Sequence, residues 1–314
     1  MISFLQRSTS SSVRAGVTLD DDTIAIALVE RTGDLVRLRH CSVTSGSGND
    51  WARRTQKATS DVEMRRVPVT TVVAENAYQL VLVECPQVPD EEVADAVRWR
   101  IKDLVAFSTE EAVIDTIDIP ALANQTSRPM IYAVAADPKL VARRVDAVSA
   151  AGLQLDAIDI PEMCLRNIAN CLPEEEQGVA LLHLEEEHGT LILSRGGVLY
   201  LIRRIDTGRR AVRALCEGEI SLGDVVSDIA LEVQRSLDYF ESHYDQRPIT
   251  QIVLGPGVPQ SFPAMLGEQL GLPVAALDLN AVLDVAQPIP VEQQPAAIMA
   301  VGAALRSAAV EAAA

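Results

Sequence analysis

The feature that most limits the fold is a block of short strands that occurs twice, near the start of the chain and after its middle. In the first copy, residues 15–30 place apolar side chains at nearly every second position, which is typical of half-buried strands. The aspartates at 20–22 interrupt this alternation as a hairpin turn. A second meander is expected within 179–205, and a helix and a strand follow each copy. The sequence therefore predicts two related α/β lobes, and the order of strands before helices argues against a simple Rossmann alternation.

The expected organisation follows from shifts in composition along the chain. The acidic turn at 173–178 is the clearest boundary. The expected parts are a flexible N-terminal tail at 1–14, a first lobe at 15–178, a second lobe at 179–294, a closing helix at 295–308 that returns to the first lobe, and a tail at 309–314.

A small α+β subdomain is expected as an insert in the first lobe, at about 78–152. Its first helix is predicted to begin at Asp90 as N-cap. Val93, Val97, Ile101 and Leu104 then recur at helical spacing and form one apolar stripe.

The remaining elements are predicted from periodicity, capping residues and turn residues. Strands are expected at 35–40, 68–74, 112–119, 130–135, 153–160, 249–254 and 274–277, helices at 138–151, 162–170, 224–244, 262–270 and 295–306, and a loop at 42–50. Gly302 lies in the last helix, where we expect a close approach of another backbone.

Composition excludes several classes of function. The net charge is -17, from 44 acidic and 27 basic residues, so the surface repels phosphate backbones and we expect no nucleic-acid partner. No apolar run is long enough for a transmembrane segment, and the opening residues do not resemble a secretory signal. The five cysteines form no C-x-x-C pair and the four histidines show no ligand spacing. We therefore expect buried thiols in a reducing cytoplasm and no metal site.

Several stretches are distinctive in their order and spacing, namely 85–99 with 104–107, 134–138 with 151–159, 232–240, 271–274 and 300–306. Together they resemble the PilM family of actin-like type IV pilus assembly proteins, and within it the MshI branch of MSHA-type pili.

The resemblance implies an actin-like fold, in which a duplicated ribonuclease H-like unit forms two lobes with an inserted small α+β subdomain. It implies ATP between the lobes and a PilN-like partner, a bitopic inner-membrane protein whose N-terminal cytoplasmic peptide the chain would bind. The location it implies is cytoplasmic, peripherally associated with the inner membrane through partners, among which the assembly ATPase is a further candidate.

The two phosphate-binding hairpins of actin-like ATPases carry Asp-x-Gly at their turns, and this chain departs from that pattern. Thr18 and Asp20 stand at the aspartate and glycine positions of the first hairpin, and His183 and Glu185 at those of the second. Each like-charge pair at 4 Å opposes an anionic ligand by roughly 1 kcal/mol in water and by about 4 kcal/mol at an effective dielectric constant of 20. We therefore expect no nucleotide cofactor, although Mg²⁺ with ATP would recover some of this energy.

If nucleotide binds, the residues in question share the two hairpins and a later glycine turn. They are Thr18, Asp20, Asp21, Asp22, Thr23, Glu185, Gly189, Thr190, Gly255 and Gly257. The alternative interpretation is that the acidic tips are solvated turns, and that the two later glycines form an ordinary turn after a strand.

The sequence therefore predicts a scaffold of a type IV, MSHA-like pilus machine that binds its partner and has no catalytic residues. The partner groove is expected on the insert, at Val93, Val97, Trp99, Leu104 and Phe107. For Trp99 the alternative is that a neighbouring loop covers the side chain. The alternative functions are a working actin-like ATPase whose ATP state regulates partner binding, and the cytoplasmic actin-like domain of a type II secretion protein.

Overall fold

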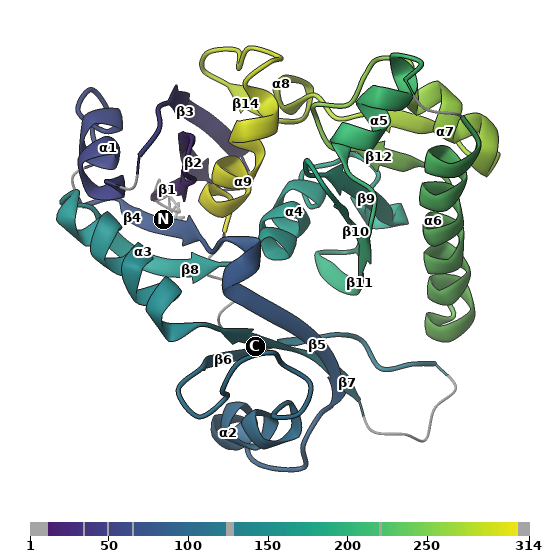
Figure 1. Cartoon of the computed structure of the whole chain (residues 1–314), viewed down its shortest axis with the longest axis horizontal. Helices are drawn as coiled ribbons and strands as arrows, with labels where there is room; N and C mark the ends of the chain where they lie inside the picture. Colours follow the sequence, from purple (N-terminus) through teal and green to yellow (C-terminus); the bar gives the residue numbers. More distant parts are fainter. Residues whose placement is uncertain are drawn as a thin grey trace, which may run out of the picture.

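The structure is a computed structural model that describes residues 12–33, 35–48, 50–64, 66–123, 129–219 and 222–306. The strands of these residues form three sheets (Figure 1). The first sheet has the order β14 (Asp284–Val285), β3 (Leu35–Ser45), β2 (Thr23–Thr32), β1 (Ser12–Leu19), β4 (Pro68–Val72) and β8 (Gln154–Asp159). The second has the order β11 (Val198–Ile205), β10 (Gly189–Arg195), β9 (Val179–Leu184), β12 (Ile252–Leu254) and β13 (Val274–Ala276).

The two large sheets repeat one topology. In each, three consecutive strands form an antiparallel meander, and two later strands add in parallel beside the first strand of that meander. The repeated block expected from the sequence is therefore confirmed.

Helices cover the first sheet on both faces. The helices α1 (Trp51–Ala58) and α3 (Pro138–Ala150) lie on one face, and α9 (Gln294–Ala304) lies on the other (Figure 1). Gly16 of β1 faces α9, because a Cβ there would come within 1.9 Å of the Ala300 carbonyl oxygen. A side chain at this position would push the helix off the sheet.

The second sheet is covered in the same way. On one face lie α5 (Arg209–Cys216), α6 (Leu222–Tyr244) and α7 (Phe262–Leu270), and α4 (Pro161–Ala169) lies on the other. The short α8 (Leu279–Val282) precedes β14, and the single-turn 3₁₀ helices η1 (Glu75–Ala77) and η2 (Glu175–Gln177) lie in connections.

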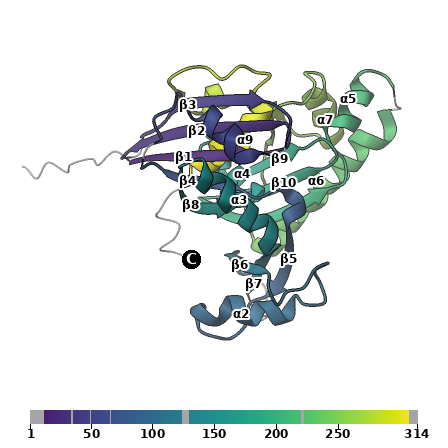
Figure 2. The ribbon, with the colours of Figure 1, turned by 60° about the vertical axis from the view of Figure 1, so that its left-hand side comes forward.

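The third sheet belongs to the inserted segment and has the order β5 (Tyr78–Glu84), β7 (Met130–Ala136) and β6 (Val113–Asp118). One face packs on α2 (Asp90–Arg100), through Val83, Val97 and Ile101 among others. Figure 2 shows this unit extending away from the two larger sheets. Because side chains alternate along a strand, the opposite face of β5 carries Tyr78, Leu80 and Leu82.

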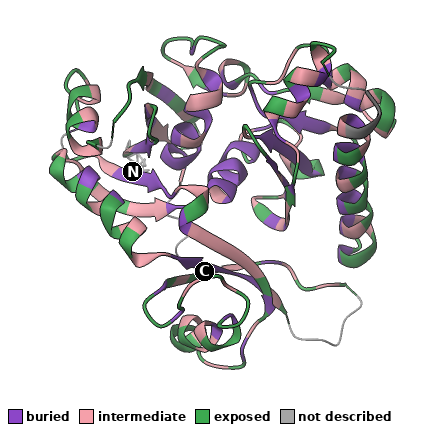
Figure 3. Cartoon of the chain, viewed as in Figure 1, coloured by how far each residue is buried: buried purple, intermediate pink, exposed green. Residues whose placement is uncertain are grey.

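The two lobes meet through α4 and α9, which pack on each other between the sheets and are almost wholly buried (Figure 3). Gly302 permits this contact, because a Cβ there would come within 2.4 Å of the Cys164 carbonyl oxygen. The Asn167 side chain donates a hydrogen bond to the Gly302 carbonyl at 2.9 Å. The close approach expected at this glycine is confirmed.

Most of the predicted strands and the longer helices are present, and the differences have local causes. The loop expected at 42–50 is shorter than predicted, since β3 continues to Ser45; residues 46–48 and 50 are loop, and α1 begins at Trp51 with Asp50 as its cap. Pro89, and not Asp90, is the N-cap of α2, and this helix ends at Arg100, so Leu104 lies beyond it. β1 begins at Ser12, within the segment expected as a tail. Residues 1–11 and the tail at 309–314 lie outside the described residues.

The contact between α4 and α9 gives a test of stability. Alanine in place of glycine inside a helix ordinarily stabilises it by about 1 kcal/mol. For Gly302→Ala we expect the opposite sign, a loss of about 2–3 kcal/mol in the free energy of unfolding, because the neighbouring backbone has no room to move.

Urea denaturation measures this difference, with Gly46→Ala as control. The Cβ of that control has no neighbour closer than 3.9 Å, so we expect its stability to change by less than about 0.5 kcal/mol. Equal or greater stability of Gly302→Ala would contradict the packing described here.

Candidate functional site

The two acidic hairpins predicted from the sequence, one in each of the two large sheets, lie close enough to interact electrostatically. Asp20 lies at the turn between β1 and β2, and Glu185 follows β9 at the second turn. Loss of hydration raises the pKa of Asp20, an effect that Arg144 opposes and to which the negative charge of Glu185 adds. The two carboxylates are therefore close enough to repel each other.

In the second hairpin, the buried His183 pairs with Glu185, whose side chain is partly exposed. Nε2 of His183 lies 3.1 Å from Oε1 of Glu185, and because a carboxylate only accepts, we assign the proton to this nitrogen. Burial favours the neutral carboxyl, but the hydrogen bond from His183 and the charge of Arg209 outweigh it and lower the pKa of Glu185. Glu185 is therefore a charged group at neutral pH.

The next two carboxylates of this hairpin are neutralised by α5. Glu186 lies 3.2 Å from Nη2 of Arg209 and 2.5 Å from Nη2 of Arg213, and Glu187 lies 2.6 Å from Nη2 of Arg210. These arginines are not predicted from the sequence as partners of the hairpin, because α5, which supplies all three, is absent from the sequence-based prediction. Their charge is largely balanced within the chain.

Arginines also surround the first hairpin. The Nη1 group of Arg54 on α1 donates to the main-chain oxygens of Asp20 and Asp21, at 3.2 and 2.7 Å. Arg144 on α3 is buried, with its guanidinium 5.2 Å from the centre of the Trp51 ring and its charge opposite Asp20. Both cations thus act on the hairpin itself.

The predicted glycine turn lies against the second hairpin. A Cβ on Gly255 would come within 2.4 Å of Nδ1 of His183, and one on Gly257 within 2.6 Å of Nη1 of Arg209. Arg209 therefore fills the space between Glu186 and the turn. The structure brings the three predicted segments together, but carboxylates and paired arginines stand where a phosphate needs free donors, so these residues fit a nucleotide poorly.

The other residues predicted for a nucleotide site lie around these hairpins. Thr18 is buried in β1, Asp21 and Asp22 are exposed at the turn, and Thr23 opens β2. Gly189 opens β10, where a Cβ would come within 2.6 Å of the Leu184 side chain.

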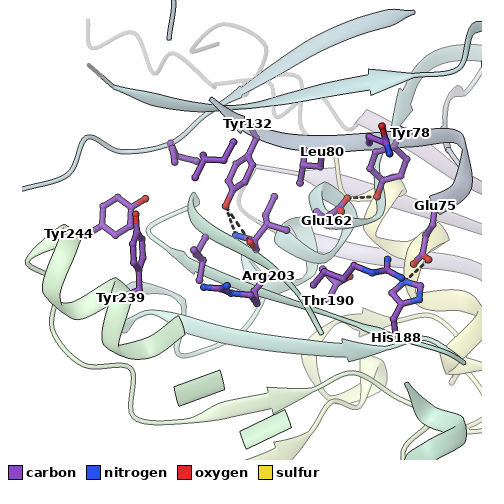
Figure 4. A pocket seen from close by; sticks show the side chains of 16 residues that line it. Glu75, Tyr78, Leu80, Tyr132, Glu162, His188, Thr190, Arg203, Tyr239 and Tyr244 are labelled. Carbon is purple, nitrogen blue, oxygen red and sulfur yellow. Dashed lines mark hydrogen bonds and ion pairs between the residues drawn. The ribbon is translucent and has the colours of Figure 1, made fainter. Parts of the chain in front are cut away.

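A separate cavity of about 750 Å³ lies between the inserted subdomain and the second lobe (Figure 4). Its walls come from β5 and β7 on one side and from β10, β11 and α6 on the other, with η1 and α4 contributing one residue each. It is lined by Glu75, Tyr78, Gln79, Leu80, Leu82, Ile119, Tyr132, Glu162, His188, Thr190, Leu201, Ile202, Arg203, Arg204, Tyr239 and Tyr244.

Tyrosine is concentrated in this cavity. The chain has five tyrosines, and Tyr78, Tyr132, Tyr239 and Tyr244 line it. The Tyr132 hydroxyl donates to the Ile202 carbonyl at 3.3 Å and accepts from the Ile202 N–H at 2.9 Å. Because tyrosine combines a large apolar ring with a polar tip, it is a preferred contact residue in binding sites.

Ionisable side chains gather at one end of the cavity. The Glu75 carboxylate lies 2.5 Å from Nε2 of His188, which links η1 to the second hairpin. The Tyr78 hydroxyl donates to Glu162 at 2.8 Å (Figure 4). Burial raises the pKa of Glu162, and the hydrogen bond from Tyr78 partly offsets this effect.

None of the five residues predicted for the partner groove lines this cavity. Val97 of α2 is buried, and Val93 and Phe107 pack against the same apolar cluster. Much of the predicted stripe therefore forms the subdomain's own core. Trp99 and Leu104 are 72% and 58% exposed. The cavity lies on the opposite face of the small sheet.

The cavity is not predicted from the sequence, because its residues come from strands and helices of the inserted subdomain and the second lobe that lie far apart along the chain. One signal was available, namely that a chain with only 4% aromatic residues carries Tyr78 in a strand and Tyr239 and Tyr244 near the end of a long helix.

Within the described ranges, no group of three His, Cys, Asp or Glu side chains is arranged to hold a metal ion. Likewise, no helix described here has the length and apolar character needed to cross a membrane.

Comparison with known proteins identifies the fold. No known protein family matches the chain, and no curated protein matches it. Among solved structures, the chain is similar to one described as the PilM-PilN type IV pilus biogenesis complex, with 20% identity, a TM-score of 0.70, and coverage of 93% of this chain and 98% of that one.

Two further structures align over similar lengths with lower scores. The ethanolamine utilization protein EutJ from Carboxydothermus hydrogenoformans has 13% identity, a TM-score of 0.48, and coverage of 94% and 90%. The cytoplasmic domain of EpsL, from the type II secretion system of Vibrio cholerae, has 11% identity, a TM-score of 0.48, and coverage of 91% and 93%. The similarity to PilM establishes the fold, and the predicted actin-like, two-lobe α/β architecture is confirmed.

Proposed function

We propose that this chain is a PilM-like scaffold protein of a type IV pilus machine. In this proposal it binds the N-terminal cytoplasmic peptide of a bitopic inner-membrane protein similar to PilN. The fold similarity to PilM, a protein whose solved structure is a complex with PilN, supports this role over nearly the full length of both chains.

The observation that carries the proposal is the tyrosine-lined cavity. It has the volume of a ligand pocket, and four of the chain's five tyrosines converge on it from β5, β7 and α6. On a chain of net charge -17, Arg203 and Arg204 stand on one wall, each beside a carboxylate of the chain, Glu232 at 3.9 Å and Asp206 at 3.6 Å. An apolar peptide fits this combination of rings and paired arginines.

An extended peptide suits the cavity better than a helix does. Among the described strands, β5 and β11 are edge strands of their sheets, and both line the cavity. Tyrosine hydroxyls already bond main-chain groups of β11, from Tyr132 to Ile202 and from Tyr244 to the Tyr200 carbonyl at 3.0 Å. We therefore propose that the peptide lies along β5, with its side chains between Tyr78, Leu80 and Leu82.

In this proposal no nucleotide binds between the two acidic hairpins. The repulsion between Asp20 and Glu185 and the occupied arginines of α5 support this assignment. The alternative, an actin-like ATPase whose nucleotide state controls partner binding, requires hydrogen-bond donors for phosphate at these hairpins.

We further propose that the chain belongs to the MSHA-type branch, as the sequence resemblance implies. It would take a peripheral position at the inner membrane through its partners, with the assembly ATPase as a second partner.

The two faces of the insert give a direct test of the binding site. Leu82 lines the cavity and is 42% exposed, so we expect the folded protein to accept a charged side chain there. We expect Leu82→Glu to weaken binding of a synthetic PilN-like N-terminal peptide by about tenfold or more, because an apolar contact is replaced by an unpaired charge. Fluorescence anisotropy of the labelled peptide measures this change.

Trp99→Glu is the matched control, on the opposite face of the same subdomain. We expect its affinity to stay within about twofold of the unmodified chain, since Trp99 does not line the cavity. The reverse pattern, with binding lost in Trp99→Glu and kept in Leu82→Glu, would move the partner to the groove expected from the sequence.

Titration with Mg-ATP separates the scaffold from the ATPase. We expect no heat of binding at millimolar nucleotide in calorimetry, and equal peptide affinity with and without Mg-ATP, because a ligand that does not bind shifts no equilibrium. A micromolar dissociation constant for ATP, or a peptide affinity that changes on adding it, would favour the ATPase.

A further inference from the structure

Glu186, whose side chain is half exposed, is held between two arginines of α5. Its two carboxylate oxygens face two guanidinium groups, with Oε1 at 3.2 Å from Arg209 and Oε2 at 2.5 Å from Arg213. Arg213 also donates through Nη1 to Oε1 at 3.4 Å, so it contacts both oxygens. Paired guanidinium donors of this kind suit a carboxylate and a phosphate group equally well.

The main chain of the hairpin is fixed against the start of α5. The amides of Arg209 and Arg210 donate to the carbonyls of Glu185 and Glu186, at 2.6 and 3.0 Å. Gly208 allows this approach, since a Cβ there would come within 2.4 Å of the Glu186 carbonyl oxygen. The Glu186 side chain is thus presented to the arginines by a rigid support.

Arg209 extends this site toward the predicted glycine turn. Its side chain is only 14% exposed, its Nε is buried without a hydrogen-bond partner, and a Cβ on Gly257 would come within 2.6 Å of its Nη1. The guanidinium therefore lies against the glycine turn and has donor capacity that Glu186 does not use.

We propose that Glu186 is an internal ligand, occupying a two-arginine anion site that takes a phosphate group once this carboxylate is neutralised. The inference rests on the proposed function, since it gives a physical reason why no nucleotide binds between the two acidic hairpins. A side chain fixed in place acts at an effective concentration on the order of millimolar or more, so phosphates in solution compete poorly with it. Exclusion then comes from occupied arginines as well as from repelling carboxylates.

Glu186→Gln tests this proposal, because it removes the charge and keeps the shape. In chloride buffer we expect the variant to melt at a lower temperature, since two arginines lose their partner. In phosphate buffer of equal ionic strength we expect the melting temperature to rise by about 2–4 °C. Pyrophosphate and Mg-ATP serve as further probes, which separate a site for free phosphate from one that takes a nucleotide.

Two controls define the site. Glu187→Gln, which frees the exposed Arg210, should show no response to phosphate, and neither should the unmodified chain. Adding Arg213→Gln to Glu186→Gln should abolish the response. If Glu186→Gln does not fold, Glu186→Asp keeps the charge and withdraws it from the arginines, and a smaller rise in phosphate is expected.

Two results would overturn the inference: no response of the folded Glu186 variants to any of these anions, or an equal response of the unmodified chain. Peptide binding provides a separate readout, because Glu186 does not line the cavity. A Glu186→Gln variant that binds the peptide normally but not phosphate disproves this inference alone, whereas failure of the unmodified chain to bind the peptide disproves the proposed function.

Discussion

The contact between α4 and α9 is the constraint on which the rest of the structure depends. Each of these helices follows one lobe in the sequence but packs on the sheet of the other lobe. Helix α4 follows β8 of the first sheet and lies on β9 and β10, whereas α9 follows the second lobe and lies on β1 and β2. The helices approach closely because Gly302 has no side chain. This crossed arrangement gives both lobes one shared core and fixes how their hairpins and the inserted subdomain face each other.

The two regions differ in what they offer beyond paired polar groups. Between the hairpins, carboxylates and arginines of the same chain pair with each other, so few groups are left for a ligand. The charged groups of the cavity beside β5 are paired as well, His188 with Glu75 and Arg203 with Glu232, but its aromatic rings and leucines line open space beside an edge strand. Such a distribution favours a protein that binds a peptide over one that binds a nucleotide, because binding energy comes mainly from desolvated rings and unpaired main-chain donors.

The sequence predicts the sheets well, and the sites less well, for physical reasons. Strands such as β1 and β2 are predicted because apolar side chains recur along them, although helices cover both faces of their sheet and bury consecutive residues where the sequence predicts half-buried strands. The long α6 is predicted because its stripe extends over several turns. The short α5 is missed because Val212 and Leu215 are its only two buried residues among three arginines, and with it the partners of Glu186 are missed. Val97 is predicted as a groove residue because an apolar stripe does not tell whether it faces a partner or the subdomain's own core.

The central claim is that the partner peptide occupies the tyrosine-lined cavity and that nucleotide does not influence it. Incorporation of 3-fluorotyrosine gives five ¹⁹F resonances, one for each tyrosine, which single Tyr→Phe variants assign. Adding the PilN-like peptide should shift the resonances of Tyr78, Tyr132, Tyr239 and Tyr244, and adding Mg-ATP should leave all five unchanged, with or without the peptide. A peptide that binds while these four resonances stay in place, or resonances that move when Mg-ATP is added, would contradict the account.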